Sequence, residues 1–143
     1  MSNAFAFAFP TNIPIVPGHI LICTKKHRRT LNDLTKKEIH AIFDLQKKLK
    51  KALTRAFKAE GFNYAWNENP VAGQNIGHFH LHMLPRKKGD TGIIRYEPRK
   101  FLYRPGSREI SPDAELAAVA KLIQSKLSIS TVSPSPRGTG LVR

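Results

Sequence analysis

The chain has 143 residues, 41% of them hydrophobic, which suits a single globular domain and excludes a largely disordered chain. Its one cysteine, Cys23, excludes an internal disulfide and a Cys-rich zinc site, and no apolar run approaches the roughly 20 residues that cross a bilayer. With 24 Lys and Arg against 10 Asp and Glu, the formal net charge is +14, which favours polyanionic partners such as nucleotides. We therefore expect a cytoplasmic protein with no membrane partner.

The N-terminal part of the chain predicts two short strands joined by a loop. Phenylalanine alternates with alanine over residues 5–9, which is typical of a strand. Prolines enclose a loop over 10–18, and the mostly apolar run 19–23 predicts a second strand. A basic turn over 25–29 follows.

A long helix is predicted next. Thr35 and Glu38 form a capping box, in which each residue satisfies a free backbone N–H of the other at the helix start. Gly61 is expected to end the helix. Apolar residues recur at helical spacing and predict one core-facing stripe: Ile39, Ile42, Leu45, Leu49, Leu53 and Ala56.

The remainder of the chain predicts two more strands and a second helix. Residues 62–66 and 77–84 have strand patterns, and a turn-rich loop separates them. A serine and a proline suit the start of a later helix. We expect one domain over 1–110, a helix packed on it over 111–127, and a disordered tail over 128–143.

The most informative feature is the alternation of histidine with apolar residues in His78-Phe79-His80-Leu81-His82. Successive side chains of a strand point to opposite faces. An extended segment would therefore place all three imidazoles on one face and the apolar side chains on the core face.

Three interpretations of this row are open. The histidines can be structural and hydrogen-bonded. They can also bind a metal ion. Residues i and i+4 of a strand lie about 13 Å apart, so all three cannot ligate one small ion, but a pair with His19, or with an acid from elsewhere, is possible. They can also form a nucleophilic site, in which a neutral imidazole attacks phosphorus while an acceptor holds its other nitrogen. Amides at Asn67 and Gln74 would orient phosphate oxygens, and this interpretation uses the whole row.

The run 72–86, AGQNIGHFHLHMLPR, resembles the histidine-triad (HIT) family of nucleotide hydrolases and transferases. It contains the alternating histidines of the family and the Gly-Gln upstream of them. Its ending Leu-Pro-Arg is similar to the fragile-histidine-triad branch, which cleaves dinucleoside polyphosphates. Two further blocks, PIVPGHILI over 14–22 and LNDLT over 31–35, resemble the family's Pro-x-x-Pro-Gly-His strand and the start of its first helix.

The resemblance implies a role for each histidine of the pattern. His80 would be the nucleophile that attacks the α-phosphorus. His82 would contact the phosphates and assist the leaving group, while His78 would support the row through hydrogen bonds. His19 matches a histidine that buttresses the site from the neighbouring strand.

The resemblance also implies substrate contacts. Asn67 and Gln74 match amide positions near the phosphates. Phe9 and Leu21 match apolar positions of a nucleoside pocket, for which core packing is an equal alternative. Thr11 stands where the family usually carries an Asn or Asp for the ribose hydroxyls. The Cys-x-x-Cys zinc motif of many relatives is absent, so no metal is expected.

From the resemblance we expect an α+β fold with an antiparallel sheet of about five strands, one long helix and a C-terminal helix. The expected activity is hydrolysis of dinucleoside polyphosphates, such as diadenosine polyphosphates, at the α-phosphate through a nucleotidyl intermediate on His80, in a homodimer. No cofactor is required, and a divalent cation, Mg or Mn, can accompany the substrate. Alternatives are an adenosine phosphoramidate hydrolase, a dinucleotide phosphorylase, and a basic DNA-binding protein that removes 5′-adenylate, although nucleic acid is the less favoured partner.

Overall fold

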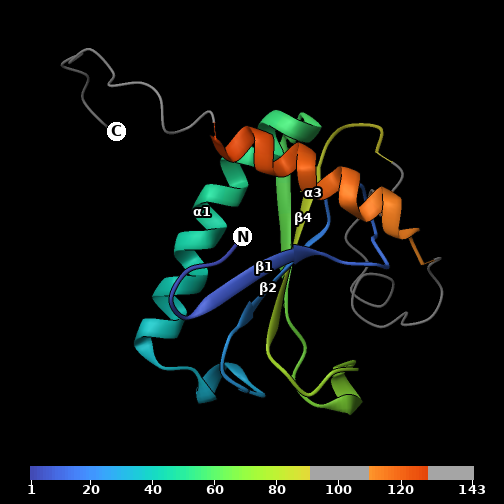
Figure 1. Ribbon diagram of the computed structural model, residues 1–143. Helices are drawn as coiled ribbons and strands as arrows, with labels where there is room; N and C mark the ends of the chain where they lie inside the picture. The colour runs from blue at the N-terminus through green and yellow to red at the C-terminus, as the bar shows by residue number, and fades with distance from the viewer. Residues whose placement is uncertain (91–109, 129–143) are drawn as a thin grey trace, which may run out of the picture.

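The computed structural model describes residues 1–90 and 110–128, which form an α+β fold (Figure 1). The class is as predicted, but the described residues contain four strands in one antiparallel sheet of order β1-β2-β4-β3, where about five were expected. The strands are β1 (Ala6–Pro10), β2 (Ile20–Thr24), β3 (Gly61–Ala65) and β4 (His80–Arg86).

Helix α1 (Lys36–Phe57) packs along one face of the sheet. The predicted capping box is confirmed, because the Thr35 side chain accepts a hydrogen bond from the Glu38 N–H and the Glu38 carboxylate accepts one from the Thr35 N–H. The predicted helix end at Gly61 is wrong. Lys58 adopts the left-handed conformation (φ 57°, ψ 38°) that ends the helix, and Gly61 begins β3 instead.

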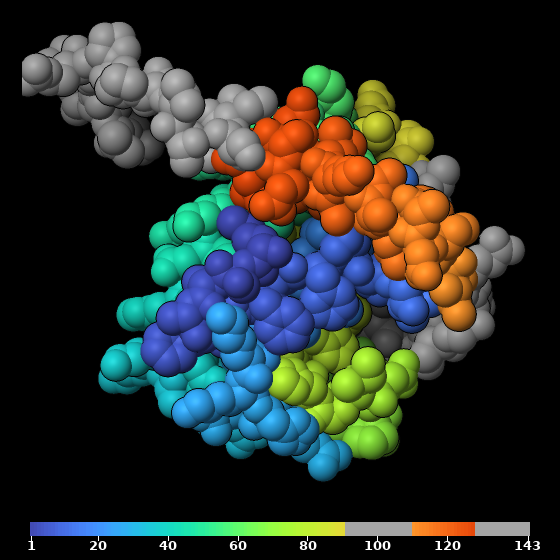
Figure 2. All heavy atoms as spheres, in the orientation of Figure 1, coloured from blue at the N-terminus to red at the C-terminus, as the bar shows by residue number. Residues whose placement is uncertain are grey.

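The hydrophobic core lies between this face of the sheet and the helices. Alternate residues of β1, β2 and β4 contribute to it, as the period of a strand requires. Helix α3 (Asp113–Ser128) lies across α1 and β1 and contacts both (Figures 1 and 2). Its Ile123 is buried in the same core. The principal core residues are Ala6, Ala8, Ile20, Ile22, Phe79, Leu81 and Met83 from the sheet side and Ile42, Leu45, Leu49 and Leu53 from α1.

Gly18 brings the loop between β1 and β2 close to the end of α1. Its φ is +86°, a conformation that favours glycine, and a Cβ there would lie 2.8 Å from Cδ2 of Phe57 and 2.9 Å from Cγ of Pro85. The following residue, His19, lies directly before β2.

Two of the predicted segments lie outside the described residues. These are most of the stretch between β4 and α3 (91–109) and the tail (129–143), so the proposed domain boundary at 110 and the disorder of the tail stay predictions. None of the helices in the described part of the chain is both long enough and apolar enough to cross a bilayer.

Candidate active site

The histidine strand begins later than predicted. We expected a strand over 77–84, but β4 starts at His80, and His78 lies in the loop before it. Only His80 and His82 therefore take the same face by strand periodicity. Their ring centroids lie 5.1 Å apart with the planes at 68°. Nε2 of His78 lies 2.7 Å from the carbonyl oxygen of Thr24, so a backbone acceptor of β2 holds that ring.

The sheet register places apolar side chains beside these two histidines. Residues directly opposite each other on paired strands point to the same face. Phe9 pairs with Leu21, and Leu21 pairs with His82, so these three form one row across the sheet. The next row contains Phe7, Cys23 and His80. This face is the one turned away from α1, since the core residues occupy the alternate positions. The structure thus brings Phe9 and Leu21 to the face of the histidines.

Hydrogen bonding fixes the tautomer of His80. Its Nδ1 lies 2.8 Å from the carbonyl oxygen of His78. A carbonyl can only accept, so Nδ1 carries a proton that it donates to His78. In the neutral ring the lone pair then resides on Nε2. This is the state that a nucleophilic imidazole requires.

A second chain of hydrogen bonds orients His82. The Ile15 N–H donates to Nδ1 of His19 at 3.1 Å, so this nitrogen is an acceptor and the proton of the neutral His19 ring is on Nε2. Nε2 of His19 lies 2.9 Å from Nδ1 of His82 and donates to it. The His82 ring is then protonated at Nε2 and presents a donor. His19 is fully buried, as suits a residue that supports another.

The predicted amide residues lie in the loop between β3 and β4, and each forms hydrogen bonds with backbone groups. Gln74 is buried, its Oε1 accepts from the Asn69 N–H at 2.7 Å, and its Nε2 donates to the Arg29 carbonyl at 2.9 Å. Nδ2 of Asn67 donates to the Gly73 carbonyl at 3.2 Å. Both amides therefore hold the conformation of this loop, and contact with phosphate stays a prediction for each.

Thr11 follows β1 at the same end of the sheet as His19. Its hydroxyl accepts from the Ile13 N–H at 3.3 Å, and its own N–H donates to the His19 carbonyl at 3.2 Å. The side chain is buried, so its role toward a ribose likewise stays a prediction.

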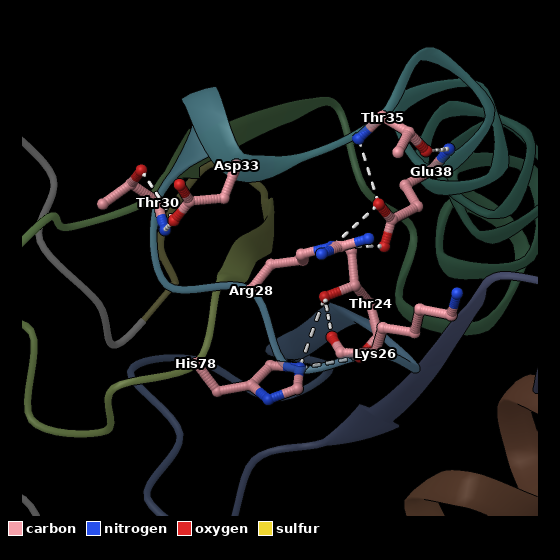
Figure 3. A network of polar contacts seen from close by, with 8 residues as sticks. All are labelled: Thr24, Lys26, Arg28, Thr30, Asp33, Thr35, Glu38 and His78. Atoms are coloured by element: carbon pink, nitrogen blue, oxygen red, sulfur yellow. Dashed lines mark hydrogen bonds and ion pairs between the residues drawn. The ribbon is translucent and has the colours of Figure 1, made fainter.

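Sequence reasoning missed two pairs of polar residues around the basic turn that follows β2 (Figure 3). Thr24, the last residue of β2, bonds to His78, and Arg28 of the turn bonds to Glu38 of α1. Arg28 was interpreted only as part of a basic turn and Glu38 only as a helix cap. No local pattern signals their pairing, because the two side chains meet through the tertiary fold.

The described residues contain no cluster of three or more His, Cys, Asp or Glu side chains arranged to hold a metal ion. The histidines instead bond one another and the backbone. These hydrogen bonds are the kind that the nucleophilic interpretation requires, and the choice among the three interpretations stays a prediction.

Comparison with known proteins finds relatives in the family that the sequence resembles. A family model described as the HIT domain matches residues 2–89. A bis(5'-adenosyl)-triphosphatase of Dictyostelium discoideum is 30% identical over 111 residues, covering 78% of this chain and 71% of that protein. An uncharacterized HIT-like protein of Mycoplasma genitalium is 37% identical over 91 residues, and this alignment spans just under two thirds of each protein, at 64%.

Solved structures agree with this result. A Hit-like protein from Bartonella henselae has a TM-score of 0.72 at 28% identity, covering 88% of this chain and 83% of that one. The diadenosine triphosphate hydrolase of Plasmodium falciparum has a TM-score of 0.61 at 25% identity, covering 92% of this chain and 72% of that one.

Proposed function

The chain belongs to the HIT family and is an enzyme of that family, and we propose that it hydrolyses dinucleoside polyphosphates through a nucleotidyl intermediate on His80. The observation that carries the proposal is the bond from Nδ1 of His80 to the His78 carbonyl, because it leaves Nε2 with the lone pair. Relatives named as a bis(5'-adenosyl)-triphosphatase and a bis(5'-nucleosyl)-tetraphosphatase support the substrate class.

The proposed first step forms a bond between Nε2 of His80 and the α-phosphorus while the P–O bond to the leaving nucleotide breaks. The ring becomes a cation, and the His78 carbonyl stabilises it by accepting the Nδ1 proton in a hydrogen bond. The Nε2–H of His82 donates a hydrogen bond to the departing oxygen as negative charge develops there.

The proposed second step returns the enzyme to its starting state. Water attacks the same phosphorus, the P–N bond breaks, and its electron pair returns to Nε2 of His80. The water proton passes to solvent, and a mononucleotide leaves. Phe9 and Leu21 would pack against the nucleoside, because the register places them in the row of His82. Asn67, Gln74 and Thr11 remain the proposed polar surroundings of the phosphates and ribose.

The test is to trap and weigh the covalent intermediate. The protein is mixed with a diadenosine polyphosphate, quenched within the first turnover and analysed by mass spectrometry, with and without added Mg or Mn. We expect an adduct of one adenylyl group on His80 and none in His80→Ala, whose turnover should fall by at least about 1,000-fold. His40→Ala, at an exposed histidine of α1, is the matched control and should form the adduct normally.

The same panel of substrates separates the alternatives. Faster turnover of an adenosine phosphoramidate would assign P–N cleavage, and release of a nucleoside diphosphate that requires inorganic phosphate would assign a phosphorylase. Release of 5′-adenylate from nicked DNA, with salt-sensitive binding, would favour the nucleic-acid alternative. A cytoplasmic location also stays a prediction.

We extend the proposal to a homodimer formed along β3, which is an edge of the described sheet. Exposed aromatic side chains gather on this side: Tyr64 and Trp66 at β3, and Phe43 on α1. The Gln46 side chain of α1 donates to the Tyr64 hydroxyl at 2.7 Å, so the two elements form one continuous surface there. An unpaired strand edge beside exposed aromatics is a surface that a second copy would cover.

A further inference from the structure

The peptide group between His78 and Phe79 is hydrogen-bonded at both ends. Its carbonyl accepts the Nδ1 proton of His80 at 2.8 Å, and its N–H donates to the carbonyl of Arg28 at 2.6 Å. The orientation of the His80 ring therefore depends on a peptide that is itself held by the basic turn after β2.

The Arg28 side chain fixes that turn to the start of α1. Its Nε lies 3.0 and 3.2 Å from the two carboxylate oxygens of Glu38, which is 2% exposed and is the third residue of the helix (Figure 3). Glu38 is itself held by Thr35 through the capping box. Burial alone would raise the pKa of Glu38, but hydrogen bonds from Thr35 and Arg28 hold it below its ordinary value, so the pair is ionised at neutral pH.

The same turn also holds the loop between β3 and β4. The carbonyl of Arg29 accepts a hydrogen bond from Nε2 of Gln74 at 2.9 Å. In the space-filling view the turn and this loop lie side by side at one end of the molecule (Figure 2). The Arg28 carbonyl thus holds the His78–Phe79 peptide, and the next carbonyl, that of Arg29, holds the loop between β3 and β4.

We propose that Arg28, locked by Glu38, is a positioning residue for His80, acting through the His78–Phe79 peptide. The inference rests on the proposed function of His80. Donation from the Phe79 N–H to Arg28 polarises the peptide, which makes the His78 carbonyl a stronger acceptor for the Nδ1 proton. The stronger bond holds the ring in one tautomer and stabilises the cation formed when Nε2 attacks phosphorus.

Three variants test the positioning role. Arg28→Met removes the guanidinium but keeps the backbone carbonyl. Glu38→Gln removes the charge yet can still serve in the capping box, so the helix start is retained. Arg28→Lys can partly restore the ion pair. The matched control is Asp90→Asn, which disrupts the ion pair of Arg86 and Asp90 (2.8 Å) at the other end of β4.

The first measurement needs no substrate. Nitrogen-15 NMR of the imidazoles reports the tautomer of His80 and the exchange of its Nδ1 proton with water. We expect Arg28→Met and Glu38→Gln to give a mixture of tautomers and faster exchange, Arg28→Lys to lie between them and the parent protein, and Asp90→Asn to match the parent. An unchanged His80 spectrum in folded Glu38→Gln and Arg28→Met would overturn the proposal. If Arg28→Met does not fold, Glu38→Gln and Arg28→Lys decide.

The second measurement is the single-turnover rate of adduct formation on His80. We expect a fall of about tenfold to a hundredfold in Arg28→Met with little change in KM, since the effect lies on the nucleophile and not on binding. If the parent protein forms no adduct while the NMR changes appear, the positioning role stands and the proposed function fails. If the parent forms the adduct and the variants form it equally fast, the positioning role fails and the function stands.

Discussion

His19 selects which nitrogen of the His82 ring carries the proton. Because the Ile15 N–H donates to Nδ1 of His19, the Nε2 proton of His19 points to His82, and His82 then offers its own Nε2 proton. The protonated nitrogen of both rings is therefore set by the single N–H of Ile15. A change at His19 should therefore alter catalysis more than stability.

We expect His19→Leu to lower kcat by about tenfold to a hundredfold, because the His82 tautomer is no longer selected. His19→Gln should retain more activity, since its amide can accept from the Ile15 N–H and donate to His82 in the same order. Steady-state kinetics of both variants, with thermal unfolding as the control for folding, provides the measurement. Equal losses in the two variants would argue against the tautomer and for simple packing.

Cys23 lies between Phe7 and His80 in its row of the sheet, and it is buried. Burial raises the pKa of its thiol to about 12, whereas the pKa of a thiol in an unfolded chain is about 8.5. The folded state therefore keeps a proton that the unfolded state loses. The stability that Cys23 contributes is complete below about pH 8.5 and falls by about 1.4 kcal/mol per pH unit above it, toward pH 12.

Comparison with Cys23→Ala isolates this effect. Between pH 8 and 10.5 the parent protein should lose about 2.5 kcal/mol more stability than the variant, measured by urea unfolding at each pH. At pH 6 and 7 the difference between the two proteins should be constant, because the thiol is protonated in both states. A constant difference up to pH 10.5 would mean that the thiol is not protected from water in the folded protein.

At the scale of elements, patterns with local causes were predictable and those with tertiary causes were not. The capping box at Thr35 is local, and its prediction is confirmed. The end of α1 could not be predicted from a local pattern. Lys58 ends the helix in a left-handed conformation that lysine disfavours, whereas glycine is the residue that a sequence pattern selects for this position, which is why Gly61 was predicted. The late start of β4 has a similar cause, because Nε2 of His78 is held at the Thr24 carbonyl.

The candidate site shows the same division. His80 and His82 are two residues apart, and strand periodicity places such residues on one face, so their common face could be predicted. The network of Arg28 and Glu38 joins residues ten positions apart through packing, and a sequence shows only a basic turn and a helix cap there.

The edge strand β3 and the adjoining part of α1 carry the prediction of a homodimer. Phe43 is 53% exposed on α1, and replacing it by lysine keeps a good helix former while placing a charge in the surface. We expect the parent protein to sediment as a dimer at micromolar concentration and Phe43→Lys to shift toward monomer. Val71→Lys is the matched control, since Val71 is 95% exposed in the loop before β4 and should not change the assembly. A monomeric parent protein would refute the dimer.

At the scale of the whole molecule, the net charge of +14 is expected to attract a polyanionic substrate from a distance. Lysines of α1, among them Lys47, Lys48 and Lys51, are exposed on the helix, which lies on the opposite side of the sheet from His80. They cannot contact a nucleotide bound at the histidines. Any attraction between these lysines and a nucleotide acts over a distance at which salt screens charges, since the Debye length is about 8 Å at physiological ionic strength.

The substrate charge therefore decides how strongly the rate responds to salt. Raising NaCl from 20 to 200 mM should lower kcat/KM for a diadenosine polyphosphate by at least about threefold, because association is steered by the positive field. An adenosine phosphoramidate carries less negative charge and should respond less, while kcat for either substrate should stay nearly constant. Replacing Lys47 and Lys51 by glutamine should reduce the low-salt kcat/KM and flatten the salt response without changing kcat. Equal salt responses for the two substrates would show that the charge of this protein serves something other than capture of its substrate.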